Sequence, residues 1–219
     1  MVQNFKNLMS QKKIFLSNEG DSYYKRNFFL HRENKNHNLI CQKILRLSNN
    51  KKKINVLEIG CGKGDLLKKL YSLKKNLKLF GLDPSNQAVK SNNNKYIKLK
   101  RGTADELPFT DKYFDFVIFG FCLYLVDKDL LLKVVCEADR VLKFNGKIVI
   151  YDFYSKKSVV SRYSHNKLIR THKMDFSKLF LTHPYYSIVF KKFGDHKDIN
   201  KKPKVSKDLI SLFILNKNV

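Results

Sequence analysis

The chain has 219 residues, a length typical of one domain with at most a modest elaboration. Hydrophobic residues make up 43% of the sequence and charged residues 29%, values that fit a globular protein and exclude a wholly disordered one. The 44 lysines and arginines outnumber the 19 aspartates and glutamates, and the formal net charge of +25 favours anionic partners such as nucleic acid or phosphorylated molecules.

Residues 1–53 are polar and show no clear strand pattern. We predict that they form a helical or irregular cap packed outside a main domain spanning 54–219. The first 20 residues lack the apolar core of a secretion signal, and the longest apolar run, 116–126, is too short to cross a bilayer. The four cysteines form no C-x-x-C pair, which indicates reduced thiols and no zinc site. These features predict a cytoplasmic protein without a membrane span.

Strand-like and helix-like segments alternate from residue 54 onward. Apolar, often β-branched stretches predict five strands, at 54–59, 77–82, 96–99, 114–119 and 147–153. Helices are expected between them, at 65–73, 84–92 and 130–142. Pro84 would lie in the first turn of the second helix, and Asn145-Gly146 would stop the third. This alternation predicts an α/β fold, with a mostly parallel sheet and helices on both faces.

Two further strand candidates, 186–193 and 209–215, end the chain. No helix-length segment separates them, so we expect them to pair antiparallel at one edge of the sheet. Before them, residues 154–170 form a polar, basic and aromatic insertion in which we predict no strand. It belongs to a substrate-side insertion at 154–185.

A glycine-rich segment, EIGCGKG at 58–64, directly follows the first predicted strand and opens a helix. Glycines allow the sharp turn and let a ligand approach the backbone, and the helix N-terminus offers unpaired amides. The spacing is G-x-G-x-G, which differs from the G-x-G-x-x-G of dinucleotide-binding enzymes and from a phosphate-binding P-loop. The segment therefore predicts a nucleoside-type ligand and disfavours a nicotinamide dehydrogenase.

Acidic residues follow the next two strands. Asp83, in GLDPS at 81–85, can accept hydrogen bonds from both hydroxyls of a ribose, or can cap the helix that follows. Asp105, in GTADELPF at 102–109, can accept from the exocyclic amine of adenine. Together with the glycine segment, these acids predict one crevice at the carboxyl edge of the sheet, where open α/β sheets bind ligands.

The motifs VLEIGCG at 56–62, GLDP at 81–84, ADELPF at 104–109 and FDFVI at 114–118 occur together. In this respect residues 54–153 resemble the class I S-adenosylmethionine (SAM)-dependent methyltransferases, especially the small-molecule, type 11-like group. The resemblance implies a Rossmann-like sheet of seven strands with an antiparallel final strand, and SAM as cofactor. It implies that Glu58 orients the glycine loop, Asp83 holds the ribose and Asp105 the adenine. Four loop residues would contact the methionine part: Gly60, Cys61, Gly62 and Gly64.

The flanks are similar to methylases associated with pseudaminic acid and other surface-glycan biosynthesis. The similarity is carried by GDSYYKRN at 20–27 and by short segments near 152–154, 163–165, 173–176 and 193–196. This chain departs from that group after the fourth strand, where Tyr124-Leu125 replaces a histidine. The resemblance implies methylation of an O or N atom of a small molecule such as a sugar, nucleotide-sugar or glycan precursor.

Methyl transfer is an in-line displacement, so the protein mainly aligns the acceptor with the donor. A hydroxyl acceptor benefits from a general base. Three residues near the predicted sheet edge are candidate bases: His165, Asp152 and Tyr124. A loop histidine is often exposed, Asp152 can instead cap a turn, and Tyr124 can form a pocket wall.

Other side chains of the insertion extend this hypothesis. His172 and Asp175 lie further along the chain as additional candidate bases. Three basic residues can bind a phosphate of the acceptor, or lie on a solvated loop: Arg162, Lys167 and Arg170.

Two other functions stay open. The charge would suit an RNA or DNA methyltransferase, but lysine dominates over arginine and no RNA-binding module is apparent, which favours a compositional origin. After the fourth strand the sequence reads FGFC at 119–122, whereas DNA amino-methylating enzymes carry Asn/Asp-Pro-Pro-Tyr/Phe there. The second alternative is a SAM-binding protein without transferase activity. The acceptor and the oligomeric state are not predicted.

Overall fold

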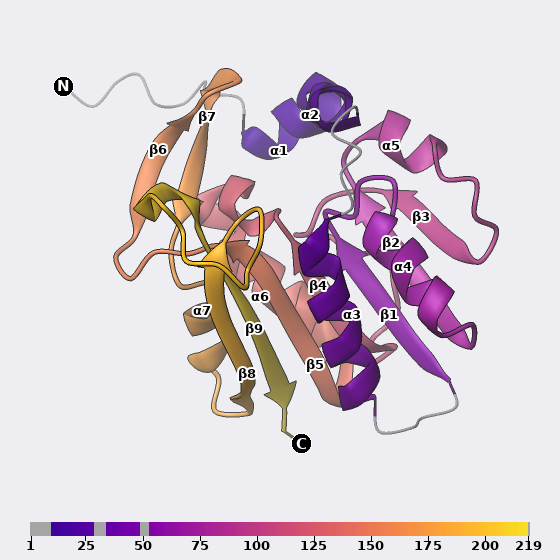
Figure 1. Cartoon of the computed structure of the whole chain (residues 1–219). Coiled ribbons are helices and arrows are strands. Elements are labelled where there is room, and N and C mark those ends of the chain that lie inside the picture. Colours follow the sequence, from indigo (N-terminus) through magenta and orange to yellow (C-terminus); the bar gives the residue numbers. More distant parts are fainter. Residues whose placement is uncertain (1–9, 29–33, 49–52, 219) are drawn as a thin grey trace.

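The structure is a computed structural model that describes residues 10–28, 34–48 and 53–218 (Figure 1). A seven-stranded sheet in the order β3-β2-β1-β4-β5-β9-β8 forms its centre. The strands are β1 (Ile54–Ile59), β2 (Leu77–Asp83), β3 (Ile97–Arg101), β4 (Phe114–Gly120), β5 (Leu142–Phe153), β8 (Tyr186–Asp195) and β9 (Leu209–Lys217). Neighbours among the first five are parallel, whereas β9 is antiparallel to both β5 and β8. This topology confirms the predicted fold class, including the terminal hairpin at the sheet edge.

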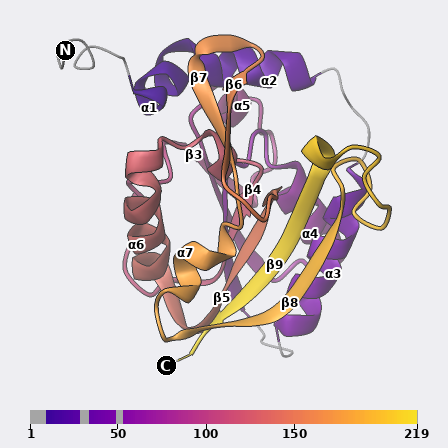
Figure 2. The same cartoon turned by 90° about the vertical axis from the view of Figure 1, so that its left-hand side faces the viewer.

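Helices cover both faces of the sheet, as Figure 2 shows with the strands seen nearly edge-on. Helices α3 (Lys35–Leu47) and α4 (Asp65–Leu73) lie on one face, and α6 (Leu131–Val141) and α7 (Ser177–Leu181) on the other. Successive strand residues point to opposite faces. In β1, Val56 accordingly packs in the cluster that contains α3 and α4, while Leu57 packs in the cluster that contains α6 and α7.

The first 53 residues contribute to two different parts of the molecule. Helix α3 buries Ile40 and Ile44 against the sheet, beside α4. Only α1 (Gln11–Ile14), η1 (Phe15–Glu19) and α2 (Gly20–Phe28) lie across one end of the sheet (Figures 1 and 2). The division of the chain at residue 53 into a cap and a main domain stays a prediction. None of the helices in the described part of the chain has the length and hydrophobicity of a transmembrane segment.

Two predicted helix boundaries are wrong. Helix α5 (Asn86–Lys90) begins after Ser85, whose hydroxyl accepts a hydrogen bond from Ala88 N, so Pro84 precedes the helix. Helix α6 ends at Val141, where the chain passes directly into β5. Asn145, with φ of 58°, lies inside that strand and does not end the helix.

The insertion at 154–170 contains two strands that were not predicted. Strands β6 (Val159–Tyr163) and β7 (Asn166–Lys173) form a separate antiparallel hairpin. Most β6 side chains are exposed, so the apolar alternation that marks a half-buried strand is missing. The hairpin lies beside α1 and α2 at the same end of the sheet in both views (Figures 1 and 2).

Candidate functional site

The glycine loop between β1 and α4 has a backbone that only glycine adopts readily. Gly60, Gly62 and Gly64 have φ of 74°, 52° and 80°, in the left-handed region. A Cβ atom at Gly60 would lie 2.6 Å from Cβ of Cys122, whereas a Cβ at Gly62 would meet nothing within 4 Å. The loop is therefore packed against the protein on one side and open on the other.

Asp83 ties this loop to the end of β2. Its Oδ2 accepts a hydrogen bond from Gly62 N and its Oδ1 accepts one from Ser85 N, both at 2.8 Å. Burial raises the pKa of Asp83 to about 6, although the two backbone hydrogen bonds act in the opposite direction. The helix-capping role considered for Asp83 belongs instead to the Ser85 hydroxyl.

Glu58 is a buried acid inside β1. Its Oε2 atom is buried and has no hydrogen-bond partner among the described residues. Burial raises the pKa of Glu58 well above its usual range, and the charges of Asp65 and Asp83 add to the effect. An unsatisfied buried acceptor is costly, so this atom fits a positively charged group of a ligand.

Asp105, in the loop after β3, is already bound by a lysine. Lys12 Nζ of α1 lies 2.7 Å from Asp105 Oδ2, and Lys133 Nζ lies 3.7 Å away. Burial raises the pKa of Asp105, but hydrogen bonds from Lys12 and Thr103 outweigh it and leave the pKa lowered. Lys12 was not predicted as a site residue, because a contact across 93 residues leaves no local signal in the sequence.

Two cavities meet at the carboxyl edge of the sheet. The first, of about 120 Å³, lies over the ends of β2 and β3 and reaches Ala104, Asp105 and Val134. The second, of about 600 Å³, lies over the glycine loop and reaches His37 and Tyr151. Five residues line both cavities, and we call them the junction residues: Gly20, Tyr23, Gly60, Asp83 and Phe121.

The N-terminal helices are anchored over these cavities by specific hydrogen bonds. The backbone amides of Gln11 and Lys12 donate to the Asp127 carboxylate at 3.0 and 2.9 Å. Asp21 Oδ1 accepts from the Ser85 hydroxyl at 2.6 Å and from Gln87 N at 3.0 Å. The cap is thus attached to the loops that follow two different strands.

The β6–β7 hairpin is attached to the same cap. Arg26 of α2 donates to the buried Glu19 and, at 3.1 Å, to the Tyr163 hydroxyl. Asn166 Nδ2 donates to Glu19 Oε2 at 3.3 Å. The hairpin therefore supports α2 and does not itself line either cavity.

The geometry does not bring the three predicted bases to the cavities. His165 is exposed in the turn between β6 and β7, where its ring packs against Tyr163. Asp152 is fully buried and accepts hydrogen bonds from the amides of Leu123, Tyr124 and Phe153, so it caps a turn. Burial raises the pKa of Asp152 to about 7, against those backbone hydrogen bonds. Tyr124 is buried and lines neither cavity, and its hydroxyl hydrogen-bonds to that of the junction residue Tyr23.

The additional candidates do not line the two cavities either. His172 is buried in β7, and burial lowers its pKa. Asp175 precedes α7 and accepts a hydrogen bond from Ser177 N at 3.1 Å. Arg162 and Arg170 are exposed cross-strand neighbours in the hairpin, so phosphate binding there stays a prediction. His37 of α3, which was not predicted from the sequence, lines the second cavity, and no other histidine of the described residues lines either of the two cavities.

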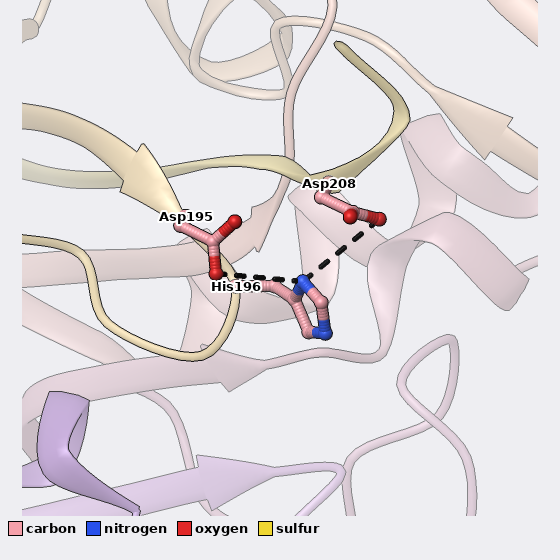
Figure 3. A group of neighbouring side chains, drawn as sticks. All are labelled: Asp195, His196 and Asp208. Atoms are coloured by element: carbon pink, nitrogen blue, oxygen red, sulfur yellow. Dashed lines mark ion pairs between the residues drawn. The ribbon is translucent and has the colours of Figure 1, made fainter. Parts of the chain in front are cut away.

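Three potential metal ligands meet outside the crevice (Figure 3). His196 Nδ1 lies 3.8 Å from Asp195 Oδ1 and 3.9 Å from Asp208 Oδ1. All three side chains are partly exposed, and the His196 amide also donates to the Asp208 carbonyl. We interpret the group as a cluster that holds the β8–β9 connection together.

Comparison with known proteins gives a domain match. Residues 57–150 match the family model described as a methyltransferase domain. The demethylmenaquinone methyltransferase of Lactobacillus johnsonii is 39% identical over 108 residues, which cover 44% of this chain and 42% of that protein. The chain thus spans less than half the length of this relative. These findings do not show the resemblance of the flanks to surface-glycan methylases.

Solved structures share the fold. The Burkholderia thailandensis 1,6-didemethyltoxoflavin-N1-methyltransferase, with bound 1,6-didemethyltoxoflavin and S-adenosylhomocysteine, has a TM-score of 0.73 at 12% identity, covering 94% of this chain and 88% of that one. A SAM-dependent methyltransferase from Methanosarcina mazei has a TM-score of 0.61 at 19% identity, covering 80% and 97%. At these identities the likeness concerns the fold alone.

Proposed function

We propose that this chain, which contains a methyltransferase domain and has the fold of SAM-dependent methyltransferases, transfers a methyl group from SAM to a small molecule. The domain match and the fold agree with the enzyme class and the cofactor predicted from the sequence. The observation that carries the proposal is the glycine loop, which is open toward a cavity at Gly62 and is hydrogen-bonded to Asp83 at the end of the next strand.

The residues present fit SAM in both cavities. Asp83 at the junction is suited to the ribose, and Asp105 in the first cavity is suited to the adenine amine. The unpaired Oε2 of Glu58, which lines the second cavity, is suited to the ammonium of the methionine part. When bound, the cofactor supplies a methyl group already activated on a cationic sulfur, so the protein has mainly to bind and align.

The second cavity supports a polar acceptor. Besides the glycine loop, it is lined by hydroxyl, amide and imidazole groups and by two lysines: Ser72, Tyr24, Tyr151, Asn27, Asn34, His37, Lys63 and Lys69. Such groups hydrogen-bond to hydroxyls, amines and anionic substituents. The acceptor we propose is therefore an O or N atom of a sugar-type small molecule, including phosphorylated ones. His37 replaces His165 as the candidate base, because it lines this cavity.

A second candidate acceptor follows from the relative that matches part of the chain. That protein is described as a demethylmenaquinone methyltransferase, and its match covers 44% of this chain. The two candidates are separated by incubating the protein with methyl-labelled SAM and either nucleotide sugars or demethylmenaquinone. Label in the sugar fraction supports the first, and label in the quinone supports the second.

Calorimetry tests the cofactor assignment directly. We expect the protein to bind SAM, and Asp83→Ala to weaken binding by at least about tenfold, because it removes the ribose acceptor and frees the glycine loop. Asp111→Ala is the matched control, since Asp111 is exposed and lines neither cavity. Circular dichroism verifies that both variants are folded. Absence of SAM binding by the unmodified protein would overturn the proposal.

A further inference from the structure

Two of the five junction residues are aromatic. Tyr23 comes from α2 of the cap, and Phe121 directly follows β4. Both are half-buried, and each lines the first cavity and the second. A ligand that extends from one cavity into the other would therefore lie beside both residues.

Phe121 has an unusual backbone. Its φ of 49° lies in the left-handed region, which is unfavourable for a bulky residue. The surroundings maintain this conformation: the Phe121 amide donates to the Tyr151 carbonyl at 2.9 Å, and its ring packs edge-on against Tyr151 and Phe153 at 4.5 and 5.2 Å. Backbone strain of this kind is retained mainly at functional sites. Here the strained conformation of Phe121 places its phenyl ring at the junction.

Tyr23 is held by the same aromatic group. Its hydroxyl hydrogen-bonds to that of Tyr124, whose ring packs edge-on against Phe153 at 5.1 Å. Phe153 in turn contacts Phe121, so the two junction rings share one support. Burial raises the pKa of Tyr23 to about 12, and the phenol is therefore neutral at physiological pH.

Two acidic side chains lie at the junction or next to it, although Lys63 and Lys69 also line the second cavity. Asp83 is the only ionic side chain among the junction residues, and Glu58 lines the adjoining second cavity. Lys12 lines the first cavity, but its ammonium is paired with Asp105. Aromatic faces attract cations, and the attraction grows when water is excluded.

We propose that Tyr23 and Phe121 form an aromatic pair that recognises the positive charge of the methyl donor at the junction. The inference rests on the proposed function, since SAM carries a sulfonium and its demethylated product S-adenosylhomocysteine carries a neutral thioether. The pair binds the charged donor more tightly than the neutral product. It therefore contributes to ligand specificity and to the positioning of the donor. It also makes the cap a part of the donor site.

Calorimetric titration of the full chain with SAM and S-adenosylhomocysteine tests the pair. The quantity measured is the ratio of the two dissociation constants, product over donor. Tyr23→Leu and Phe121→Leu keep apolar bulk but remove the ring, and we expect each to lower the ratio about three- to tenfold. Tyr23→Phe is the matched control, because it keeps the ring and loses only the hydroxyl, and its ratio should stay near that of the unmodified protein.

A second variant at Phe121 controls for misfolding of the leucine variant. Phe121→Gly removes the ring while accepting the positive φ, so it should fold and lower the ratio to a similar extent. An unchanged ratio in the leucine and glycine variants, including one in which the affinities for both ligands fall equally, would overturn the proposal. The two rings would then contribute only apolar contacts. Failure of the unmodified protein to bind either ligand would instead contradict the proposed function.

Discussion

At the scale of single residues, the described structure separates acids that hold the protein together from acids available to a ligand. Asp152 uses both carboxylate oxygens on backbone amides inside the protein, and Asp127 uses both on the cap. Glu58 is different, because one of its oxygens is buried without a partner. The sequence marks all three only as aspartate or glutamate near a strand end, so this distinction could not be predicted from residue type.

Glu58 gives a pH-dependent prediction. Its pKa in the folded state is raised, so the unfolded chain releases this proton first, and folding stability falls as pH rises from the usual carboxyl range toward the raised value. Glu58→Gln removes this dependence of stability on pH and keeps the shape of the side chain. We expect the variant to melt at a higher temperature than the unmodified protein near neutral pH, and at a similar temperature near pH 4.

Scanning calorimetry without and with SAM measures both effects. The added ammonium group should favour the carboxylate, so SAM should raise the melting temperature of the unmodified protein more than that of Glu58→Gln. Equal ligand-induced shifts in the two proteins would show that Glu58 does not meet the cation.

At the scale of elements, the parts that could be predicted are those with strong local patterns. The strands β1, β2, β4 and β9 and helix α4 were predicted to within a residue or two, because each has a continuous apolar or helical-period pattern. The β6–β7 hairpin could not be predicted in this way, since its position depends on contacts with Arg26, Glu19 and Gln11 of a distant segment. The glycine loop and Asp83 were predicted for the same reason as the strands: they directly follow them.

Helix α3 gives a second prediction, because it lies in the predicted cap but packs in the core. Ile44 is completely buried there. Ile44→Ala should lower the free energy of unfolding by roughly 2–5 kcal/mol, the usual cost of an aliphatic side chain removed from a packed core.

Urea denaturation measures the effect, with Leu132→Ala as the control. Leu132 of α6 is 67% exposed, so its truncation should change stability by no more than about 0.5 kcal/mol. A loss for Ile44→Ala as small as that of the control would show that α3 is a peripheral element.

At the scale of the whole molecule, the net charge of +25 contrasts with a crevice whose most distinctive groups are acidic and aromatic. Most lysines in the described part of the chain are exposed, and they are spread over loops as well as strands and helices. We therefore expect binding to RNA or DNA to be non-specific, with affinity falling steeply between about 50 and 200 mM salt. Fluorescence anisotropy with labelled oligonucleotides measures it, and a preference for one sequence at physiological salt would contradict a purely compositional charge.

The contact between Lys12 and Asp105 has a consequence for how the chain and its ligand influence each other. The lysine of α1 and the adenine amine proposed at Asp105 are hydrogen-bond donors to one carboxylate. Entry of the nucleoside and detachment of the first helix are thus thermodynamically linked. If the nucleoside displaces the lysine from this carboxylate, a change that weakens the contact of Lys12 with Asp105 strengthens nucleoside binding, and by reciprocity the bound nucleoside destabilises the attachment of α1 by the same free energy.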